Sequence, residues 1–216
     1  MKCKYGTIIY HMSFDQIASK ESLEKTVSGL EGKGYGVEVV GSKAEALDKI
    51  KELVPSGVSV MNGASVTLEE IGYVDYLASG EHEWEDLHAK VNNEDDKEKR
   101  KKVRRESVLS DYYLGSVHAL AETGEFVVAS NTGSQLPHVV YTSPNLVFVV
   151  GTQKIVASLD EAMNRLKSYV VPKEDKHMQE LYNVHTNLSK VVMFLDEAEM
   201  TGRSVQFVLV EEKLGF

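Results

Sequence analysis

Val58-Ser59-Val60-Met61-Asn62-Gly63-Ala64-Ser65-Val66-Thr67 joins a short apolar run to a polar loop that contains a glycine. The loop stands where a strand should pass into a helix. Glycine there lets the backbone approach a ligand, while exposed N–H groups and the helix dipole favour an anion. Two similar loops, Ala121-Glu122-Thr123-Gly124 and Ser130-Asn131-Thr132-Gly133-Ser134-Gln135, follow later. Because ligands of open α/β sheets bind beyond the carboxyl ends of the strands, these loops predict a small-molecule site.

Strands and helices are expected to alternate along the chain. The near-continuous apolar runs Glu125–Ala129 and Leu146–Gly151 are typical of strands buried on both faces in a sheet covered by helices. A last strand is predicted over Ser204–Val210. The pattern predicts an α/β fold, a three-layer α/β/α sandwich. We expect a single domain over residues 1–216, with an N-terminal helix at about 14–32 packed on a core at about 35–216.

Several shorter segments carry local predictions. Thr67 and Glu70 have the spacing of a capping box, which predicts a helix from Leu68 to about Ala78. The segment His118–Ala121 is predicted as one helical turn. An amphipathic helix around Leu159–Leu166 is expected to end at Pro172, and another helix is expected over about Asp175–Lys190.

The charge balance restricts the kinds of partner. The 216 residues hold 24 Lys and Arg against 33 Asp and Glu, a formal net charge of −9. Such a field repels polyanions, which argues against nucleic acid or an anionic membrane. No apolar run approaches the roughly 20 residues that cross a bilayer, so we expect no membrane insertion and a cytoplasmic location. The basic run Lys97–Arg105 fits a solvated helical face, or a basic patch for a phosphate or a nucleic acid.

The spacing of cysteine and histidine residues does not match any motif that binds a metal or a cofactor. Cys3 is the single cysteine, so neither an internal disulfide nor a thiolate-ligated zinc or iron–sulfur centre can be built, and we expect no special role for it. The seven histidines lack HxH or HExxH spacing, and no nucleophile elbow is present. We therefore expect no metal site and no cofactor.

The three polar loops supply the candidate site residues. Glu122 is the candidate catalytic residue, because a carboxylate beside a glycine turn can act as base, nucleophile or acceptor for a ligand hydroxyl. Each loop also has a purely structural interpretation. The first loop can be a helix N-cap with a tight turn, Glu122 can be an exposed turn residue, and the third loop can be a plain hairpin or crossover turn. The candidate ligand-binding residues are Asn62, Gly63, Ser65, Thr67, Thr123, Gly124, Asn131, Thr132, Gly133 and Ser134.

Four blocks of the chain resemble the LUD domain family, which is named for lactate utilisation. They are MNGASVTLEEIGYVDYL (Met61–Leu77), SDYYLGSVHALAETGEFV (Ser110–Val127), ASNTGSQLPHVVYTSPNLVFVVGTQKIVASLDEAMNRL (Ala129–Leu166) and the closing VQFVLVEEKLGF. The third block includes a Val-Gly-x-x-Lys-Ile-Val strand end. The resemblance covers about residues 35–216 and implies the NagB/RpiA/CoA-transferase-like fold. It implies that Gly63, Ser65 and Thr67 line a binding loop, and that Glu122 with Gly124 stands where CoA-transferases carry their nucleophile.

The same resemblance implies a role in oxidising lactate to pyruvate, within a system that contains iron–sulfur proteins. The cysteine-rich segment of some members is missing here, so any cluster would belong to a partner. We expect an accessory or small-molecule-binding protein of lactate or 2-hydroxy-acid utilisation. A stand-alone transferase or isomerase, using Glu122 on a phosphorylated or CoA-linked molecule, is one alternative. A non-catalytic regulatory binding module is another. Whether the protein is an enzyme and whether it forms a homo-oligomer are left open.

Overall fold

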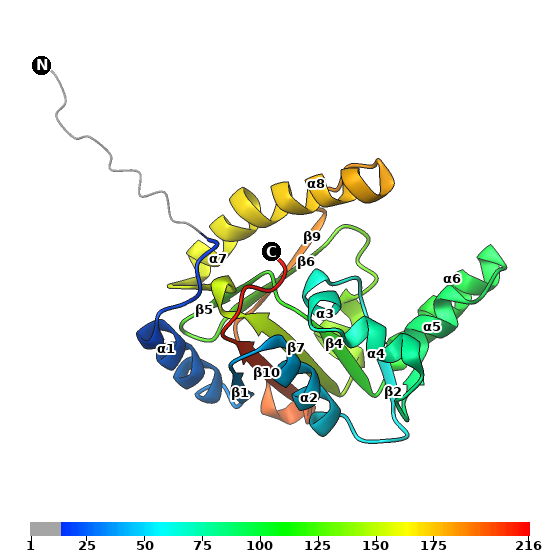
Figure 1. Cartoon of the computed structure of the whole chain (residues 1–216), viewed down its shortest axis with the longest axis horizontal. Helices are drawn as coiled ribbons and strands as arrows, with labels where there is room; N and C mark the ends of the chain where they lie inside the picture. The colour runs from blue at the N-terminus through cyan, green and yellow to red at the C-terminus, as the bar shows by residue number, and fades with distance from the viewer. Residues whose placement is uncertain (1–13) are drawn as a thin grey trace, which may run out of the picture.

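The chain folds around a parallel sheet of six strands (Figure 1). The computed structural model describes residues 14–216, so Cys3 lies outside the described residues. The strand order is β1-β10-β7-β4-β2-β3, and each neighbouring pair is parallel. Because parallel strands end at one edge, the loops after these strands share that edge. The strands are β1 (Gly36–Val40), β2 (Ser59–Asn62), β3 (Glu85–Asp86), β4 (Tyr112–Gly115), β7 (Asn145–Gly151) and β10 (Ser204–Val210).

A second sheet of four strands has the order β8-β5-β6-β9 and is mixed in direction. Its strands are β5 (Ala119–Ala121), β6 (Phe126–Ser130), β8 (Ile155–Val156) and β9 (Lys190–Phe194). The helical turn predicted over His118–Ala121 is therefore wrong. Residues 119–121 are wholly buried, and the Ala121 N–H donates to the Glu125 carbonyl (2.8 Å) to close a hairpin. Three buried residues are too few to show a strand period.

Helices lie on both sides of this β structure. Helices α2, α3 and α4 cover one face of the six-stranded sheet, while α1 and the smaller sheet cover the other (Figure 1). Helix α7 packs on the outer face of the smaller sheet. The predicted three-layer α/β/α sandwich is confirmed. The helices are α1 (Lys20–Glu31), α2 (Lys43–Leu53), α3 (Val66–Glu70), α4 (Tyr73–Ser79), α5 (Leu87–Asn92), α6 (Lys97–Glu106), α7 (Leu159–Arg165) and α8 (Val171–Tyr182).

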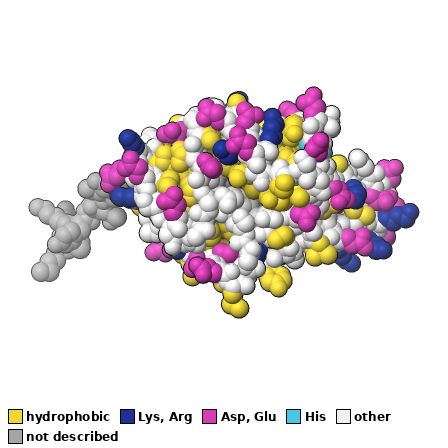
Figure 2. All heavy atoms as spheres, turned by 90° about the horizontal axis from the view of Figure 1, so that it is seen from below, with side chains coloured by type: hydrophobic (Ala, Val, Ile, Leu, Met, Phe, Trp, Pro, Cys, Tyr) yellow, Lys and Arg dark blue, Asp and Glu magenta, His cyan; other side chains and the backbone are white. Residues whose placement is uncertain are grey.

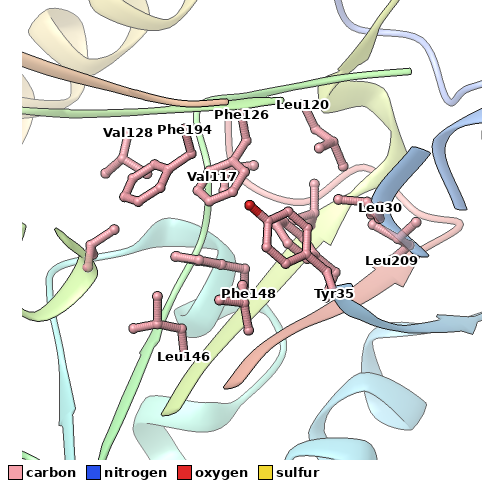
Figure 3. Close-up of a cluster of buried hydrophobic side chains, with 14 of the residues drawn as sticks. Leu30, Tyr35, Val117, Leu120, Phe126, Val128, Leu146, Phe148, Phe194 and Leu209 are labelled. Carbon is pink, nitrogen blue, oxygen red and sulfur yellow. The ribbon is translucent and has the colours of Figure 1, made fainter. Parts of the chain in front are cut away.

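Alternation along β7 divides the core between the two faces. Leu146, Phe148 and Val150 join the cluster that faces the smaller sheet, whereas Val147 and Val149 join the cluster under α2, α3 and α4. In the first cluster the rings of Phe126 and Phe194 stack with centroids 4.5 Å apart, and Phe148 lies 5.4 Å from Phe126 (Figure 3). This aromatic packing fixes the smaller sheet against the middle of β7 in the larger one.

Three further helical predictions need correction. The helix predicted over Leu68–Ala78 is two helices, because Gly72 adopts a left-handed conformation (φ 80°) between α3 and α4. The N-cap of α3 is Ser65, whose hydroxyl accepts from the Leu68 N–H (3.4 Å). The hydroxyl of Thr67, which the capping-box spacing had suggested as the cap, is therefore not used to cap the helix.

The predicted helix end at Pro172 is also wrong. A π-helical turn, Leu166–Val170, connects α7 to α8, and Pro172 stands in the first turn of α8, where its missing N–H costs nothing. Helix α8 ends at Asn183 with φ 53°, so the helix predicted to Lys190 stops early. Lys190 instead begins β9, which pairs with β6.

The basic run Lys97–Arg105 forms most of α6, which has no buried residue. Charged groups of both signs cover the projecting end of the molecule that carries α5 and α6 (Figures 1 and 2). Lys101 pairs with Glu98 (2.7 Å) and Lys102 with Glu106 (3.6 Å), as expected for a solvated helix. No helix among residues 14–216 is long and apolar enough to span a membrane.

Candidate functional site

A cavity of about 380 Å³ opens at the carboxyl edge of the six-stranded sheet. Its floor consists of the segments that follow β2, β4 and β7, together with Gly215 after β10. Residues 129–135, at the end of β6, form a side wall, and α8 with the turn before it forms the roof. Ligands of parallel α/β sheets generally bind at this edge.

Lys154 is the central side chain of the floor. It lies at the end of a short 3-10 turn, Thr152–Lys154, that follows β7, and it is 3% exposed. Its Nζ donates to Thr67 Oγ1 (2.9 Å) after β2 and to Ser116 Oγ (3.1 Å) after β4. The hydrogen bonds therefore join loops from three strands, and this convergence depends on the strand order.

The charge of Lys154 is not neutralised within residues 14–216. No carboxylate of these residues lies within 4.0 Å of Nζ, although burying a lysine without an acidic partner is costly. Burial, aided by the charge of Arg165 and opposed by Glu70, lowers the pKa of Lys154 to about 7 from 10.5. An ammonium has three N–H donors, and two are used here. One donor remains beside the cavity.

The closing segment of the chain packs tightly on Lys154. Gly215 has φ +60°, and a Cβ at this position would lie 2.5 Å from Thr67 Oγ1 and 3.2 Å from Lys154 Nζ. Its N–H donates to Glu70 Oε2 (2.6 Å). Thr67 Oγ1 donates in turn to the Leu214 carbonyl (3.3 Å). A residue with a side chain at 215 would close the space around the ammonium.

His118 supplies a neutral donor on the same floor. The Ala129 N–H donates to its Nδ1 (3.1 Å), so the proton of the neutral ring is on Nε2. Burial, with the charges of Lys154 and Arg165, lowers the pKa of His118 to about 3. The ring lines the cavity. His118 can thus donate to a ligand oxygen without adding charge near neutral pH.

Arg165 supports this floor from below. The guanidinium is fully buried, Nη1 donates to the His118 carbonyl, and the group lies 5.1 Å from the centre of the Tyr169 ring. Burial lowers the pKa of Arg165 to about 10, so it is charged at neutral pH. A second buried cation behind the floor increases the positive potential where a ligand would bind.

The roof is different in character. Helix α8 presents Val171, Glu174, Met178 and Leu181 to the cavity. Burial raises the pKa of the Glu174 carboxyl, and nearby His177 opposes this. His177 contacts the ring of Phe216 at 5.8 Å, which closes one side of the roof.

The structure brings the first and third predicted loops together. A Cβ on Gly63 would lie 2.9 Å from Gln135 Oε1, which accepts from Tyr113 Oη (3.0 Å). Asn62 and Gly133 do not line the cavity. The Asn62 side chain is buried and donates to the Gly63 carbonyl (3.2 Å), and Gly133 packs on Lys190. The predicted residues that line the cavity are Gly63, Ser65, Thr67, Asn131, Thr132 and Ser134.

The second predicted loop lies elsewhere. Glu122, Thr123 and Gly124 form the β5–β6 turn and face helix α1, outside the residues that line the cavity. The Glu122 carboxylate is 3.9 Å from Lys25 Nζ, and the turn approaches Gly29 so closely that a Cβ there would be 2.5 Å from the Glu122 carbonyl oxygen. Thr123 donates to the Glu125 carboxylate. The predicted catalytic residue Glu122 is thus separate in space from the predicted ligand-binding residues that line the cavity.

Reasoning from the sequence alone did not select Lys154, Ser116 or His118. Lys154 carried a signal, because a lone cation followed the apolar run of β7 within the Val-Gly-x-x-Lys-Ile-Val motif. Ser116 and His118 carried none, since His118 opened a segment that was predicted as a helical turn and Ser116 lay just before it. They become site residues through the pairing of β4 with β2 and β7.

Fold and site together describe an α/β protein with a cavity at the carboxyl edge of a parallel sheet and a buried lysine in the floor of that cavity. The LUD domain model matches residues 23–193, and the chain belongs to this family. Its fold is similar to the crystal structure of a DUF162 family protein from Deinococcus radiodurans, with a TM-score of 0.54 and 14% identity. That similarity covers 90% of this chain and 99% of the other, and at this identity it concerns the fold alone. No curated protein matches the chain.

Proposed function

We propose that this protein binds the anion of a small organic acid, and that Lys154 holds the acid group. The observation that carries the proposal is a buried ammonium that has no carboxylate partner among residues 14–216 and lines a cavity with one N–H donor left over. An anion that enters would supply the missing negative charge in a site of low dielectric, where charge-assisted hydrogen bonds are strongest.

The family connection supports a 2-hydroxy acid as the ligand. A carboxylate at Lys154 would place a neighbouring hydroxyl or oxo group among further donors, of which Ser116 and His118 lie on the same floor. We propose that the protein serves as an accessory component of lactate or related 2-hydroxy-acid utilisation. Electron transfer would then belong to iron–sulfur partners, and a cytoplasmic location is part of the same proposal. Phosphorylated and CoA-linked molecules present the same anionic chemistry and are included in the test.

Thermal unfolding with a panel of anions tests the proposal. At about 100 times its Kd a ligand adds roughly 2.7 kcal/mol of stability. We expect stabilisation by lactate or another 2-hydroxy acid, and loss of that stabilisation in Lys154→Met. Lys33→Met is the control, because Lys33 pairs with Glu125 (3.1 Å) away from the cavity.

The variant Glu122→Gln separates this site from the β5–β6 turn. Stabilisation that survives in Lys154→Met and disappears in Glu122→Gln would contradict the proposal and favour chemistry at Glu122. An absence of stabilisation by every acid, phosphate and CoA ester in the panel would contradict it as well.

The affinity for an acid should also depend on pH. The ammonium form binds the anion, and its population falls as the pH rises above about 7, so the affinity should fall by up to tenfold per pH unit. The titratable groups around Lys154 are His118, Arg165 and Glu70, with Glu69, Glu174 and His177 around the cavity. Calorimetry in buffers of different ionisation enthalpy should show proton uptake on binding at pH 8. His177→Gln should retain the uptake, and binding without proton exchange would contradict the role of Lys154.

A further inference from the structure

We infer that the ligand is an organic acid with an apolar chain longer than that of lactate, whose chain lies beneath α8; this rests on the proposed function. The cavity has two unlike walls. The floor and the side wall are polar, with Lys154, Ser116 and the loop from Ser130 to Gln135. The roof is largely apolar, and its apolar lining residues are Leu166, Val170, Val171, Met178, Leu181 and Tyr182. A ligand that satisfies both walls is amphipathic.

The apolar face of α8 is directed at the cavity. Val171, Glu174, Met178 and Leu181 recur at helical spacing and line the cavity, so they share one face of the helix. None of the twelve residues of α8 is buried. An amphipathic helix is normally stabilised by burial of its apolar face. Here that face borders empty space, which an apolar ligand chain would fill.

The volume of the cavity and the apolar residues at its outer end fit a ligand with an alkyl chain. A volume of about 380 Å³ lies within the range of sites for larger ligands, and a water molecule occupies about 30 Å³ of liquid, so a three-carbon acid leaves much of the cavity unfilled. Beyond Met178 the roof ends in two uncovered apolar side chains, Leu181 at 58% and Tyr182 at 66% exposure. The apolar lining therefore continues to the surface.

The raised pKa of Glu174 is compatible with this arrangement. Its carboxyl is the one acidic group that α8 directs at the cavity, and it has no salt bridge with another residue of the 14–216 range. Burial raises the pKa of this carboxyl, so its charged form is disfavoured where an alkyl chain would lie. The negative charge of the ligand remains at the floor, near Lys154.

Titration calorimetry with straight-chain 2-hydroxy acids, from lactate to 2-hydroxydecanoate below their micelle concentrations, tests the inference. At pH 6, where Lys154 is charged, each added methylene should tighten binding about fourfold, the gain that burial of one CH₂ group gives. The gain should stop once the chain reaches the surface. The double variant Met178→Gln/Leu181→Ser should reduce this gain to less than twofold per methylene.

Leu195→Ser is the matched control, because Leu195 is also 58% exposed and does not line the cavity. It should retain the full dependence on chain length. Equal affinities for lactate and the longer acids would overturn the inference, leave the proposed function standing, and assign the apolar face of α8 to a protein partner. A chain-length dependence unchanged in the double variant would overturn it as well. If no acid of any length binds, the proposed function itself fails.

Discussion

The ligand-free Lys154→Met variant is expected to be more stable than the wild type at pH 6, by about 1–4 kcal/mol, the range found when buried ion pairs are replaced by well-packed apolar side chains of similar size. The substitution removes a buried ammonium that has no acidic partner among residues 14–216. It leaves few unsatisfied groups, because Thr67 Oγ1 still donates to the Leu214 carbonyl (3.3 Å) and Ser116 Oγ to the Val117 carbonyl (3.4 Å). A functional charge that weakens the fold is the expected signature of a binding site.

The stability difference should depend on pH in one direction. Folding lowers the pKa of Lys154 from 10.5 to about 7, so between these values the unfolded chain binds more protons than the folded one. The wild type therefore gains stability as the pH rises through this window, and its difference from Lys154→Met should narrow. Chemical denaturation of both proteins from pH 6 to 10 measures this. Lys33→Met, which removes a paired lysine, should lower stability instead. A large loss of stability in Lys154→Met would show that Lys154 serves mainly to join the loops.

Arg203→Ala is expected to lower the free energy of unfolding by about 3–5 kcal/mol, because it breaks a buried ion pair and leaves backbone acceptors without donors. The Arg203 side chain is 4% exposed and pairs with Glu197 (3.0 Å). Its remaining donors hold the π-helical turn His138–Thr142, which precedes β7. They bind the carbonyl oxygens of His138 (3.0 Å), Val139 (2.9 Å), Val140 (3.0 Å) and Ser143 (3.1 Å).

Urea denaturation measures the effect of Arg203→Ala. Arg203→Lys should recover only part of the loss, because an ammonium cannot reproduce the planar arrangement of five donors. Arg104→Ala on the exposed helix α6 is the control and should stay within about 0.5 kcal/mol of the wild type. A loss below 1 kcal/mol in Arg203→Ala would mean that water replaces these hydrogen bonds.

The elements that the sequence predicted well are those with long apolar runs. The last strand was expected over Ser204–Val210 and is β10 with the same bounds, and β7 differs from its prediction by one residue. Both are central strands, so their composition alone marks them. The strand β5 was missed because three residues show no period. The strand β9 was missed because the helix was expected to continue to Lys190. The left-handed conformation of Asn183, which ends α8, is not predicted by any local pattern.

The sequence predicted those residues of the candidate site that have a local signal, and it missed those that depend on the order of the strands. Gly63, Ser65 and Thr67 were found because glycine and hydroxyl residues after a strand are a local signal. The meeting of Lys154 with Thr67 and Ser116 depends on the order β7-β4-β2, which composition does not reveal. The separation of Glu122 from the cavity has the same origin, since its turn belongs to the second sheet. Its role as a catalytic residue stays a prediction.

The pKa of Lys154, measured with and without a bound acid, tests the central claim most directly. Lysines labelled with ¹³C at Cε can be followed by NMR from pH 5 to 11, and the Lys154 signal is the one missing in Lys154→Met. The account predicts titration near pH 7 in the ligand-free protein and a rise of at least one pH unit when the site is saturated with a 2-hydroxy acid. Titration above pH 10 that does not change with the acid would contradict an unpaired cation that binds the ligand.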